Sequence, residues 1–96
     1  MPNVIIDIIP EPSIIGSGAS TKLVITYEAI TAGPLELRTS APFTISRSSI
    51  PLAPDPNGHV QESVAIKRTT PNAGPARCDV LATFFTSSLH FFVEVT

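Results

Sequence analysis

Apolar and polar residues alternate along several short stretches of this chain. In the stretch TKLVITYEAI, residues 21–30, Leu23, Ile25 and Tyr27 fall on one face and Glu28 on the other. Successive side chains of a β-strand point to opposite sides of a sheet, so a period of two indicates a strand with one face in the core.

Similar runs recur along the chain, and turn residues separate them. Ten prolines and five glycines interrupt the sequence, and no window repeats apolar residues at helical spacing over three turns. Short β-rich runs at such intervals are typical of a sandwich or barrel. The predicted runs are NVIIDII (3–9) with a short extended continuation SIIGSG (13–18), TKLVITYEAI (21–30), PLELRTS (34–40), PFTISRSSIPL (42–52), HVQESVAIKRT (59–69), and two strands within RCDVLATFFTSSLHFFVEVT (77–96).

One polar face per strand favours two antiparallel sheets that bury their apolar sides against each other. About seven strands in some hundred residues is the size of an immunoglobulin-like domain. We therefore predict an all-β fold, an immunoglobulin-like antiparallel β-sandwich of about seven strands, formed by residues 1–96 as a single domain. The chain has no tryptophan and one cysteine, Cys78, which excludes the disulfide framework of antibody domains.

The opening of the chain carries a family resemblance. The pattern VIIDIIPEPSIIGSG followed by TKLVITYEA resembles the start of bacterial immunoglobulin-like modules of the CARDB and related adhesion-repeat kind. Those modules open with a strand, a proline-rich kink, a glycine and a long second strand. The resemblance implies a binding or structural module, and it brings no catalytic motif.

The last twenty residues hold the one cysteine, and alternation predicts how they pair. If Val80 and Phe84 face inward, an even loop keeps their partners inward too, whereas an odd loop would bury Glu94 opposite Val80. Four-residue hairpin loops are common. We therefore expect a loop over residues 86–89, with Phe84 opposite Phe91.

This parity separates the groups that could form a reactive pair. Cys78 then faces the core and His90 the outside, so His90 cannot act as a base for the thiol. Cys78 is expected to be a small buried hydrophobe, and its neighbours Arg77 and Asp79 to form a surface pair.

Other candidate chemistry is sparse. His59 and His90 are not spaced along the sequence as metal ligands are. The stretch PDPNGH (54–59) contains the Asp-x-Asn-Gly pattern that begins a calcium-binding loop, but it lacks the later ligands of such a loop. Asn-Gly after two prolines predicts a turn there instead. The acidic residues fall on different faces, and no nucleophile or phosphate-loop motif is present. We expect no enzymatic activity, no cofactor and no metal.

Glu62 conflicts with its own alternation, because it falls on the inward face with Val60 and Val64. An unpaired buried carboxylate is costly. Either the strand begins near Ser63, or a bulge turns Glu62 outward.

Net charge and hydropathy restrict the classes of partner and the location that the sequence is compatible with. The net charge is −2 and the six basic residues are scattered, which argues against nucleic acid and against an anionic membrane surface. No apolar run approaches the roughly 20 residues of a membrane helix, and the first residues lack a signal-peptide pattern. The chain is expected outside the cytoplasm if it is a fragment of a larger protein, and in the cytoplasm if Met1 is its native start.

The outward face of the last hairpin is unusually apolar. Leu81, Phe85, His90 and Phe92 are predicted to share it, and such a patch favours an interface. The alternative is that the chain's own proline-rich segment 51–57 covers it. The partner would be another protein, a neighbouring domain or a second copy.

Three functions remain open. The first is a non-enzymatic binding or structural module for protein–protein or cell-surface interaction. The second is a small stand-alone accessory or inhibitor protein that uses the same sheet face. The third is a carbohydrate-binding module, although Tyr27, its one tyrosine, is predicted to be buried.

Overall fold

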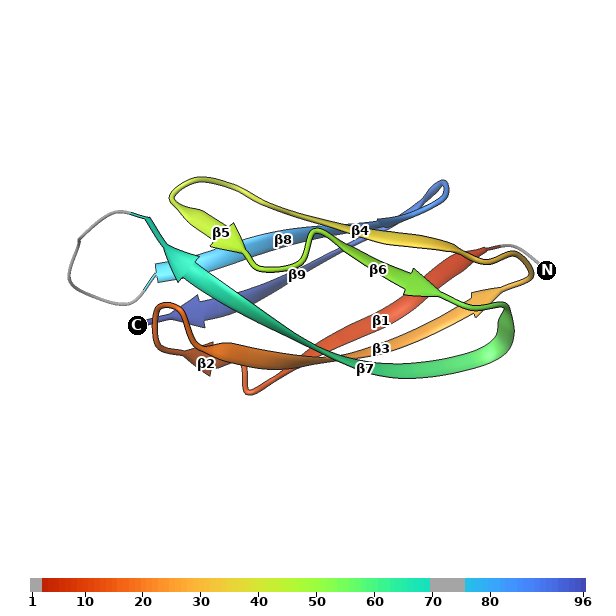
Figure 1. Cartoon of the computed structure of the whole chain (residues 1–96), viewed down its shortest axis with the longest axis horizontal. Coiled ribbons are helices and arrows are strands. Elements are labelled where there is room, and N and C mark those ends of the chain that lie inside the picture. Colours follow the sequence, from red (N-terminus) through yellow and green to blue (C-terminus); the bar gives the residue numbers. More distant parts are fainter. Residues whose placement is uncertain (1–2, 70–75) are drawn as a thin grey trace.

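The computed structural model describes residues 3–69 and 76–96, and within these ranges it contains strands and no helix (Figure 1). The all-β prediction is confirmed. The strands are β1 (Val4–Glu11), β2 (Ile14–Ile15), β3 (Ser20–Ala29), β4 (Gly33–Thr39), β5 (Phe43–Ile45), β6 (Ser49–Leu52), β7 (Asp55–Arg68), β8 (Ala76–Phe84) and β9 (Ser87–Val95).

The strands form two sheets. One has the order β1-β3-β7-β5 and the other β2-β9-β8-β4-β6. Neighbouring strands are antiparallel except β2, which runs parallel to β9. The inward side chains of both sheets form one cluster of buried hydrophobic residues, so the core lies between the sheets.

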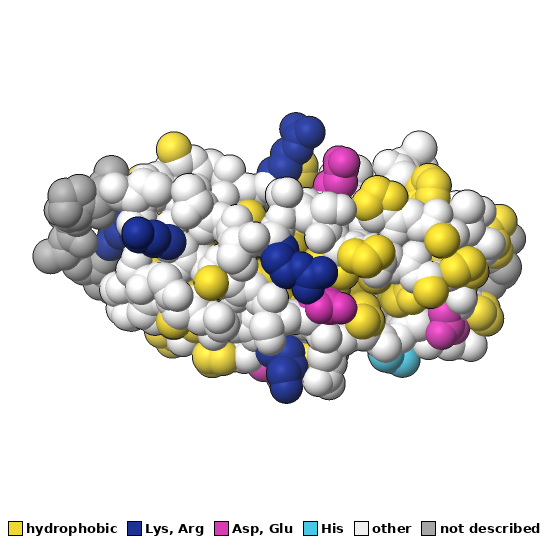
Figure 2. Space-filling model, in the orientation of Figure 1, with side chains coloured by type: hydrophobic (Ala, Val, Ile, Leu, Met, Phe, Trp, Pro, Cys, Tyr) yellow, Lys and Arg dark blue, Asp and Glu magenta, His cyan; other side chains and the backbone are white. Residues whose placement is uncertain are grey.

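The alternation of the sequence is preserved in the long strands. Leu23 and Ile25 on β3 are fully buried, as are Leu35 on β4 and Ile66 on β7. Figure 2 shows the face on which β5, β6 and β7 lie. Hydrophobic side chains gather there over β6 and the adjoining half of β7, and the charged side chains are of both signs.

Residues 42–52 form two strands on different sheets rather than one run. Phe43–Ile45 pairs with the end of β7, whereas Ser49–Leu52 pairs with β4. The link between them is held to both sheets, because the Ser46 amide donates to Ala65 O (2.9 Å) and Ser48 O accepts from the Leu37 amide (2.9 Å). This split, together with β2, explains why the described residues contain nine strands instead of about seven.

The register of the last hairpin differs from the prediction. Phe84 lies opposite Ser87 and Val80 opposite Phe91, so the loop is two residues long. The predicted register would have left residues 76–79 of β8 without a partner on β9, whereas the observed one pairs β8 from Ala76 to Phe84. Both loops are even, so the inward and outward faces are unchanged.

Asn57 and Gly58 lie inside β7 and do not form the predicted turn. Gly58 pairs with Tyr27, and a Cβ at Gly58 would overlap the Tyr27 ring. Close approach of the ring to the backbone therefore explains this glycine. The pairing then shifts between Tyr27 and Ala29, and the Tyr27 hydroxyl donates to Ala53 O at 2.9 Å.

Glu62 follows neither of the two predicted solutions. β7 is continuous through Glu62, which pairs with Leu23 without a bulge. Its carboxylate instead accepts a hydrogen bond from Arg47 Nη1 at 2.6 Å, and both side chains remain about one-third exposed. An ion pair that keeps contact with water removes the penalty of an unpaired carboxylate on the inward face.

Candidate functional site

The outer face of the five-stranded sheet is set by the register of three strands. Leu81 on β8 lies opposite His90 on β9, and Phe92 lies opposite Asp79. Ile14 on β2 pairs with Glu94 on β9, one outward position beyond Phe92. Outward positions of an antiparallel pair that differ by two residues, as Leu81 and Phe92 do, are diagonal neighbours about 7–8 Å apart.

Ile14, Phe92 and Leu81 therefore form a diagonal across β2, β9 and β8, which we call the outer-face stripe. Their side chains are 56%, 52% and 36% exposed, respectively. Single exposed apolar residues are normal on a protein surface, but contiguous ones mark interaction sites. The stripe is the set of exposed apolar residues that the register places at diagonal positions on adjacent strands of this sheet face.

Charged side chains border the stripe. The Arg77 guanidinium lies 5.0 Å from the centre of the Phe92 ring, a cation–π distance. Arg77 Nε also lies 3.3 Å from Asp79 Oδ1, so the predicted surface pair is confirmed. Arg38 lies opposite Leu81 and makes no ion pair with any residue in the described ranges. An apolar centre with a charged rim is the composition of a protein interface.

Of the four predicted interface residues, the structure brings Leu81, His90 and Phe92 together. Phe85 lies apart from them, because the shorter loop places it in the turn with a φ of 55°. Its ring meets the Phe84 ring edge-on at 4.8 Å and covers Gly33, where a Cβ would overlap it. Half of Phe85 is thus used for packing within the chain.

Sequence reasoning missed Ile14. The feature of the sequence that pointed to it is the adjacent pair Ile14-Ile15: in a strand, one of two neighbouring side chains faces outward, and here Ile14 is exposed and Ile15 is buried. What places it beside Phe92 is the parallel pairing of β2 with β9, which joins residues 80 positions apart. No local pattern announces a pairing of that range.

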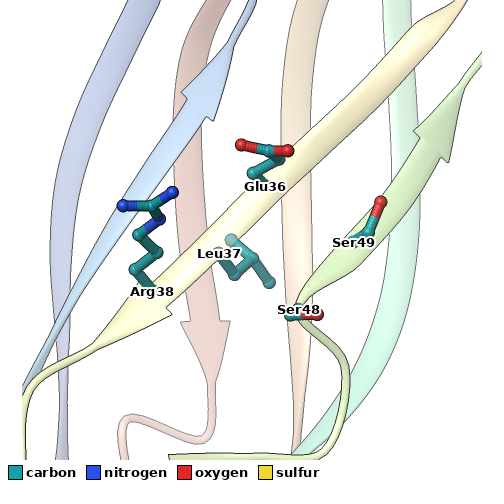
Figure 3. A pocket seen from close by; sticks show the side chains of 5 residues that line it. All are labelled: Glu36, Leu37, Arg38, Ser48 and Ser49. Carbon is teal, nitrogen blue, oxygen red and sulfur yellow. The ribbon is translucent and has the colours of Figure 1, made fainter.

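Two shallow hollows lie beside β4 on the same sheet. One, of about 210 Å³, is lined by Glu36, Leu37, Arg38, Ser48 and Ser49 (Figure 3). The other, of about 240 Å³, is lined by Pro34, Glu36, Thr83 and Phe85. Both are smaller than the roughly 300–1,000 Å³ of typical small-molecule sites. They offer hydroxyl, carboxylate and guanidinium groups to a polar ligand at the surface.

Cys78 and His90 lie on opposite faces of the sheet, as predicted. Cys78 is fully buried, and burial raises the pKa of its thiol to about 11, with a smaller contribution from the charge of Asp79. A thiolate is the reactive form of cysteine, so this environment suppresses nucleophilic chemistry at Cys78.

The histidines do not form a metal site with other residues. His59 Nδ1 lies 3.3 Å from Thr26 Oγ1 on the outer face of the other sheet. Within residues 3–69 and 76–96, no three histidine, cysteine or acidic side chains are placed to hold a metal ion. The same ranges contain no helix long and apolar enough to span a membrane.

Among the described residues, the outer face of the five-stranded sheet carries the apolar outer-face stripe, its charged rim and two shallow polar hollows. Comparison with known proteins adds no homologue to this picture: no protein-family model matches the chain, and no curated protein is significantly similar to it.

Proposed function

We propose that this protein is a non-enzymatic binding or structural module that contacts a protein partner through the outer-face stripe. The observation that carries the proposal is the exposure of Ile14, Phe92 and Leu81 at diagonal positions on adjacent strands of one sheet face. Aromatic residues and arginine are enriched at interfaces, and Phe92 with Arg77 above it provides both.

An immunoglobulin-like sandwich is the scaffold that we infer for this module. The sheet orders β1-β3-β7-β5 and β9-β8-β4 correspond to the A-B-E-D and G-F-C orders of that fold. One departure concerns the order along the chain: β5, at the position of strand D, comes before β6, which lies next to β4 at the position of strand C′. The resemblance of the first strands to CARDB-type adhesion repeats supports the same proposal.

The double variant Leu81→Ser/Phe92→Ser tests the proposed site. Both side chains point outward, so we expect a change in unfolding free energy within about 1 kcal/mol for the pair. Loss of a central aromatic from an interface weakens binding by about 2 kcal/mol or more, roughly thirtyfold in Kd. The partner would be captured from an extract on the immobilised protein, purified, and titrated against each variant by calorimetry.

The matched control is Ile9→Ser. The side chain of Ile9 is 48% exposed, a fraction similar to that of Phe92, but Ile9 lies on β1 in the other sheet. This control should bind like the unmodified protein. Equal binding by the double variant would refute the stripe as the site, and unfolding of the double variant would show that the stripe belongs to the core.

Two forms of this function are compatible with the stripe. The chain could be a module of a larger protein, or a stand-alone accessory or inhibitor protein. Capture distinguishes them, because a stand-alone inhibitor binds one soluble partner in a fixed ratio. A module that packs against its neighbour binds the adjoining domain of its own protein.

A carbohydrate ligand is the second candidate, favoured by the hollow in which the exposed edge of Phe85 lies beside Glu36 and Thr83. An aromatic wall with hydrogen-bonding groups is suited to a sugar ring. Glu36→Gln should then weaken binding on a glycan array, while the stripe variant should not.

A further inference from the structure

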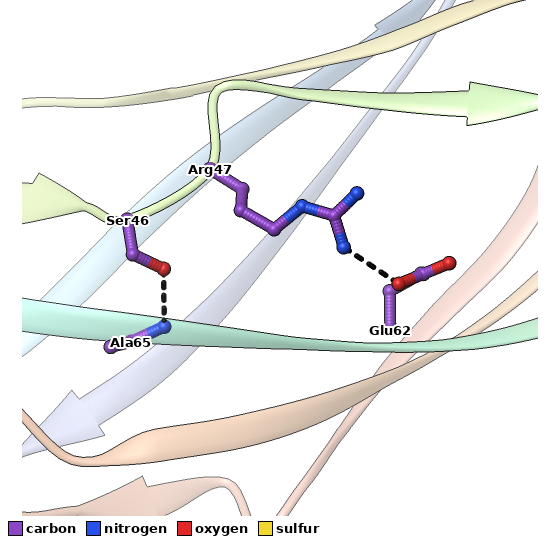
Figure 4. Close-up of polar contacts among 4 residues, drawn as sticks. All are labelled: Ser46, Arg47, Glu62 and Ala65. Carbon is purple, nitrogen blue, oxygen red and sulfur yellow. Dashed lines mark hydrogen bonds and ion pairs between the residues drawn. The ribbon is translucent and has the colours of Figure 1, made fainter.

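Two opposite charges on β4 have no partner within the described part of the chain. Glu36 and Arg38 are exposed on the outer face of this strand, and Leu37 between them is buried on the inner side (Figure 3). Arg47, by contrast, pairs with Glu62 at 2.6 Å (Figure 4). Among the described residues, neither Glu36 nor Arg38 forms an ion pair or a side-chain hydrogen bond. The outer face therefore presents one negative and one positive group, about 7 Å apart along the strand.

The two exposed aromatic rings of this face lie on opposite sides of the same level. Leu37 pairs with Ala82 and Ala82 with Leu89, so these residues mark one level across β4, β8 and β9. Phe85 is three residues beyond Ala82, and Phe92 is three residues beyond Leu89. Because β8 and β9 are antiparallel, the two rings lie in opposite directions from this level. Leu37 thus marks the midpoint between the rings as well as between the charges.

We propose that the protein partner of this face is a second copy of the chain, an inference that rests on the binding function proposed for the outer-face stripe. The two outer faces meet with their strands antiparallel, about a twofold axis that crosses β4 at Leu37. Glu36 of each copy then faces Arg38 of the other, so the contact contains the same ion pair twice. A twofold interface requires such a self-complementary surface.

The spacing of stacked sheets suits these ion pairs. Sheets that pack face to face lie about 10 Å apart, a gap that the long Arg38 side chain and Glu36 span from opposite sides. The strands of packed sheets are rotated against each other by about 30°. Such a rotation displaces positions beside the axis least, and both charges are one residue from it. The two ion pairs therefore keep their match in a twisted sheet.

The same axis brings the aromatic ends of the two faces together. Phe92 of one copy reaches the level of Phe85 of the other, one strand away, or about 5 Å across the sheet. Phe85 borders the hollow of about 240 Å³ together with Pro34 and Thr83, so the Phe92 ring lies beside an apolar wall. Leu81 faces Thr83 of the other copy. The contact thus includes Leu81, Phe85 and Phe92, although Phe85 lies apart from the other two within one copy.

The size of the contact sets the strength to expect. Three strands about 4.8 Å apart, over the seven levels between the rings, provide roughly 400 Å² of sheet in each copy. Stable complexes cover about 800 Å² per partner, and weaker ones less. We therefore expect a reversible dimer that forms at high micromolar concentration.

Charge reversal tests the twofold pairing. Glu36→Arg places arginine against arginine at both ion pairs, and Arg38→Glu places carboxylate against carboxylate. Each variant alone should dimerise with a Kd at least about tenfold higher than that of the unmodified protein. An equimolar mixture of the two should dimerise like the unmodified protein, because the arginines of one variant face the carboxylates of the other. The double variant Glu36→Arg/Arg38→Glu should recover as well. Sedimentation equilibrium at low ionic strength measures all of these samples.

Lys22→Glu is the matched control. It changes the net charge by the same amount as Arg38→Glu, but Lys22 is exposed on β3 in the other sheet. This control should dimerise like the unmodified protein, and far-ultraviolet circular dichroism shows whether each variant is folded. An unmodified protein that stays monomeric up to millimolar concentration overturns the second copy as partner. A mixture no more associated than its two components overturns the axis at Leu37.

The same measurements separate this inference from the function on which it rests. Leu81→Ser/Phe92→Ser should also dimerise more weakly, because both side chains lie in the contact. A monomeric protein that still captures a foreign partner through the stripe overturns the second copy and leaves the proposed function standing. Dimerisation that the stripe variant abolishes and charge reversal leaves unchanged overturns the Leu37 axis, while the stripe remains the contact.

Discussion

Single residues on β8 show how one position along a strand decides chemistry. Cys78 faces inward and its thiol is held protonated, whereas its neighbours Arg77 and Asp79 pair with each other in solvent. Phe84 and Phe85 are adjacent in the chain, yet one is fully buried and the other lies in the turn. The period of two, and not the residue type, separates a core position from a surface one.

The raised thiol pKa predicts a pH dependence of stability. Burial raises the pKa of Cys78 from 9.0 to about 11 in the folded protein. Between these values the unfolded chain loses the proton and the folded chain keeps it, so stability falls as the pH rises from 9 to 11. The loss assigned to Cys78 is on the order of 2 kcal/mol.

Urea denaturation at a series of pH values measures this effect. Cys78→Ala should show a smaller loss than the unmodified protein over the same interval, because other groups that titrate there are common to both. Parallel pH profiles for the two proteins would contradict the prediction. Native Cys78 should also resist thiol reagents at pH 8 and react once the chain is unfolded.

At the scale of elements, β7 makes several of the contacts that the sequence alone did not predict. It pairs with both β3 and β5, and it carries the close approach to Tyr27 and the Arg47–Glu62 pair. Gly58 lets the Tyr27 ring lie against β7, and the Tyr27 hydroxyl reaches Ala53 O beyond the start of the strand. The strand and the segment before it are thus tied to β3 through one aromatic residue.

Gly58→Ala should destabilise the protein by about 1–3 kcal/mol, because the new methyl group overlaps the Tyr27 ring and forces a shift in a packed core. Gly16→Ala is the matched control, since a Cβ there meets no atom within 4 Å. Thermal unfolding gives the stability. Fluorescence of Tyr27 reports its displacement directly, because the chain has no tryptophan. Equal melting temperatures for the two variants would show that the ring moves aside freely.

At the scale of the whole molecule, one buried core joins the two sheets. Phe84 on β8 meets Tyr27 of the other sheet edge-on, with ring centres 6.2 Å apart. The outer-face stripe lies on the other face of β8 and β9, away from this contact.

Phe84→Ala should remove about 3–5 kcal/mol of stability, because it opens a cavity where the sheets meet. A domain of this size holds about 5–15 kcal/mol in total, so the variant should be close to unfolding at room temperature. Chemical denaturation with far-ultraviolet circular dichroism measures both. A loss below about 1 kcal/mol would mean that the sheets do not depend on this contact.

The core positions were predictable because they depend on local alternation alone. The same holds for the outward direction of Leu81, His90 and Phe92, since any even hairpin loop preserves it. The candidate site was predictable only to that extent. Phe85 was grouped with it by an assumed loop length, and Ile14 was absent because its neighbour Phe92 is 78 positions away in the sequence.

The sequence by itself determined that the chain is all β, which side chains of the long strands are buried, and that Cys78 and His90 lie apart. These follow from a period of two, which a shift of register by an even number of residues does not alter. Only the tertiary structure decided the hairpin register, the split of residues 42–52 between two sheets and the pairing of β2 with β9. It also decided that Gly58 lies under Tyr27 and that Arg47 reaches Glu62. Those outcomes depend on competition among long-range backbone pairings and on the shapes of side chains that meet only in the folded chain.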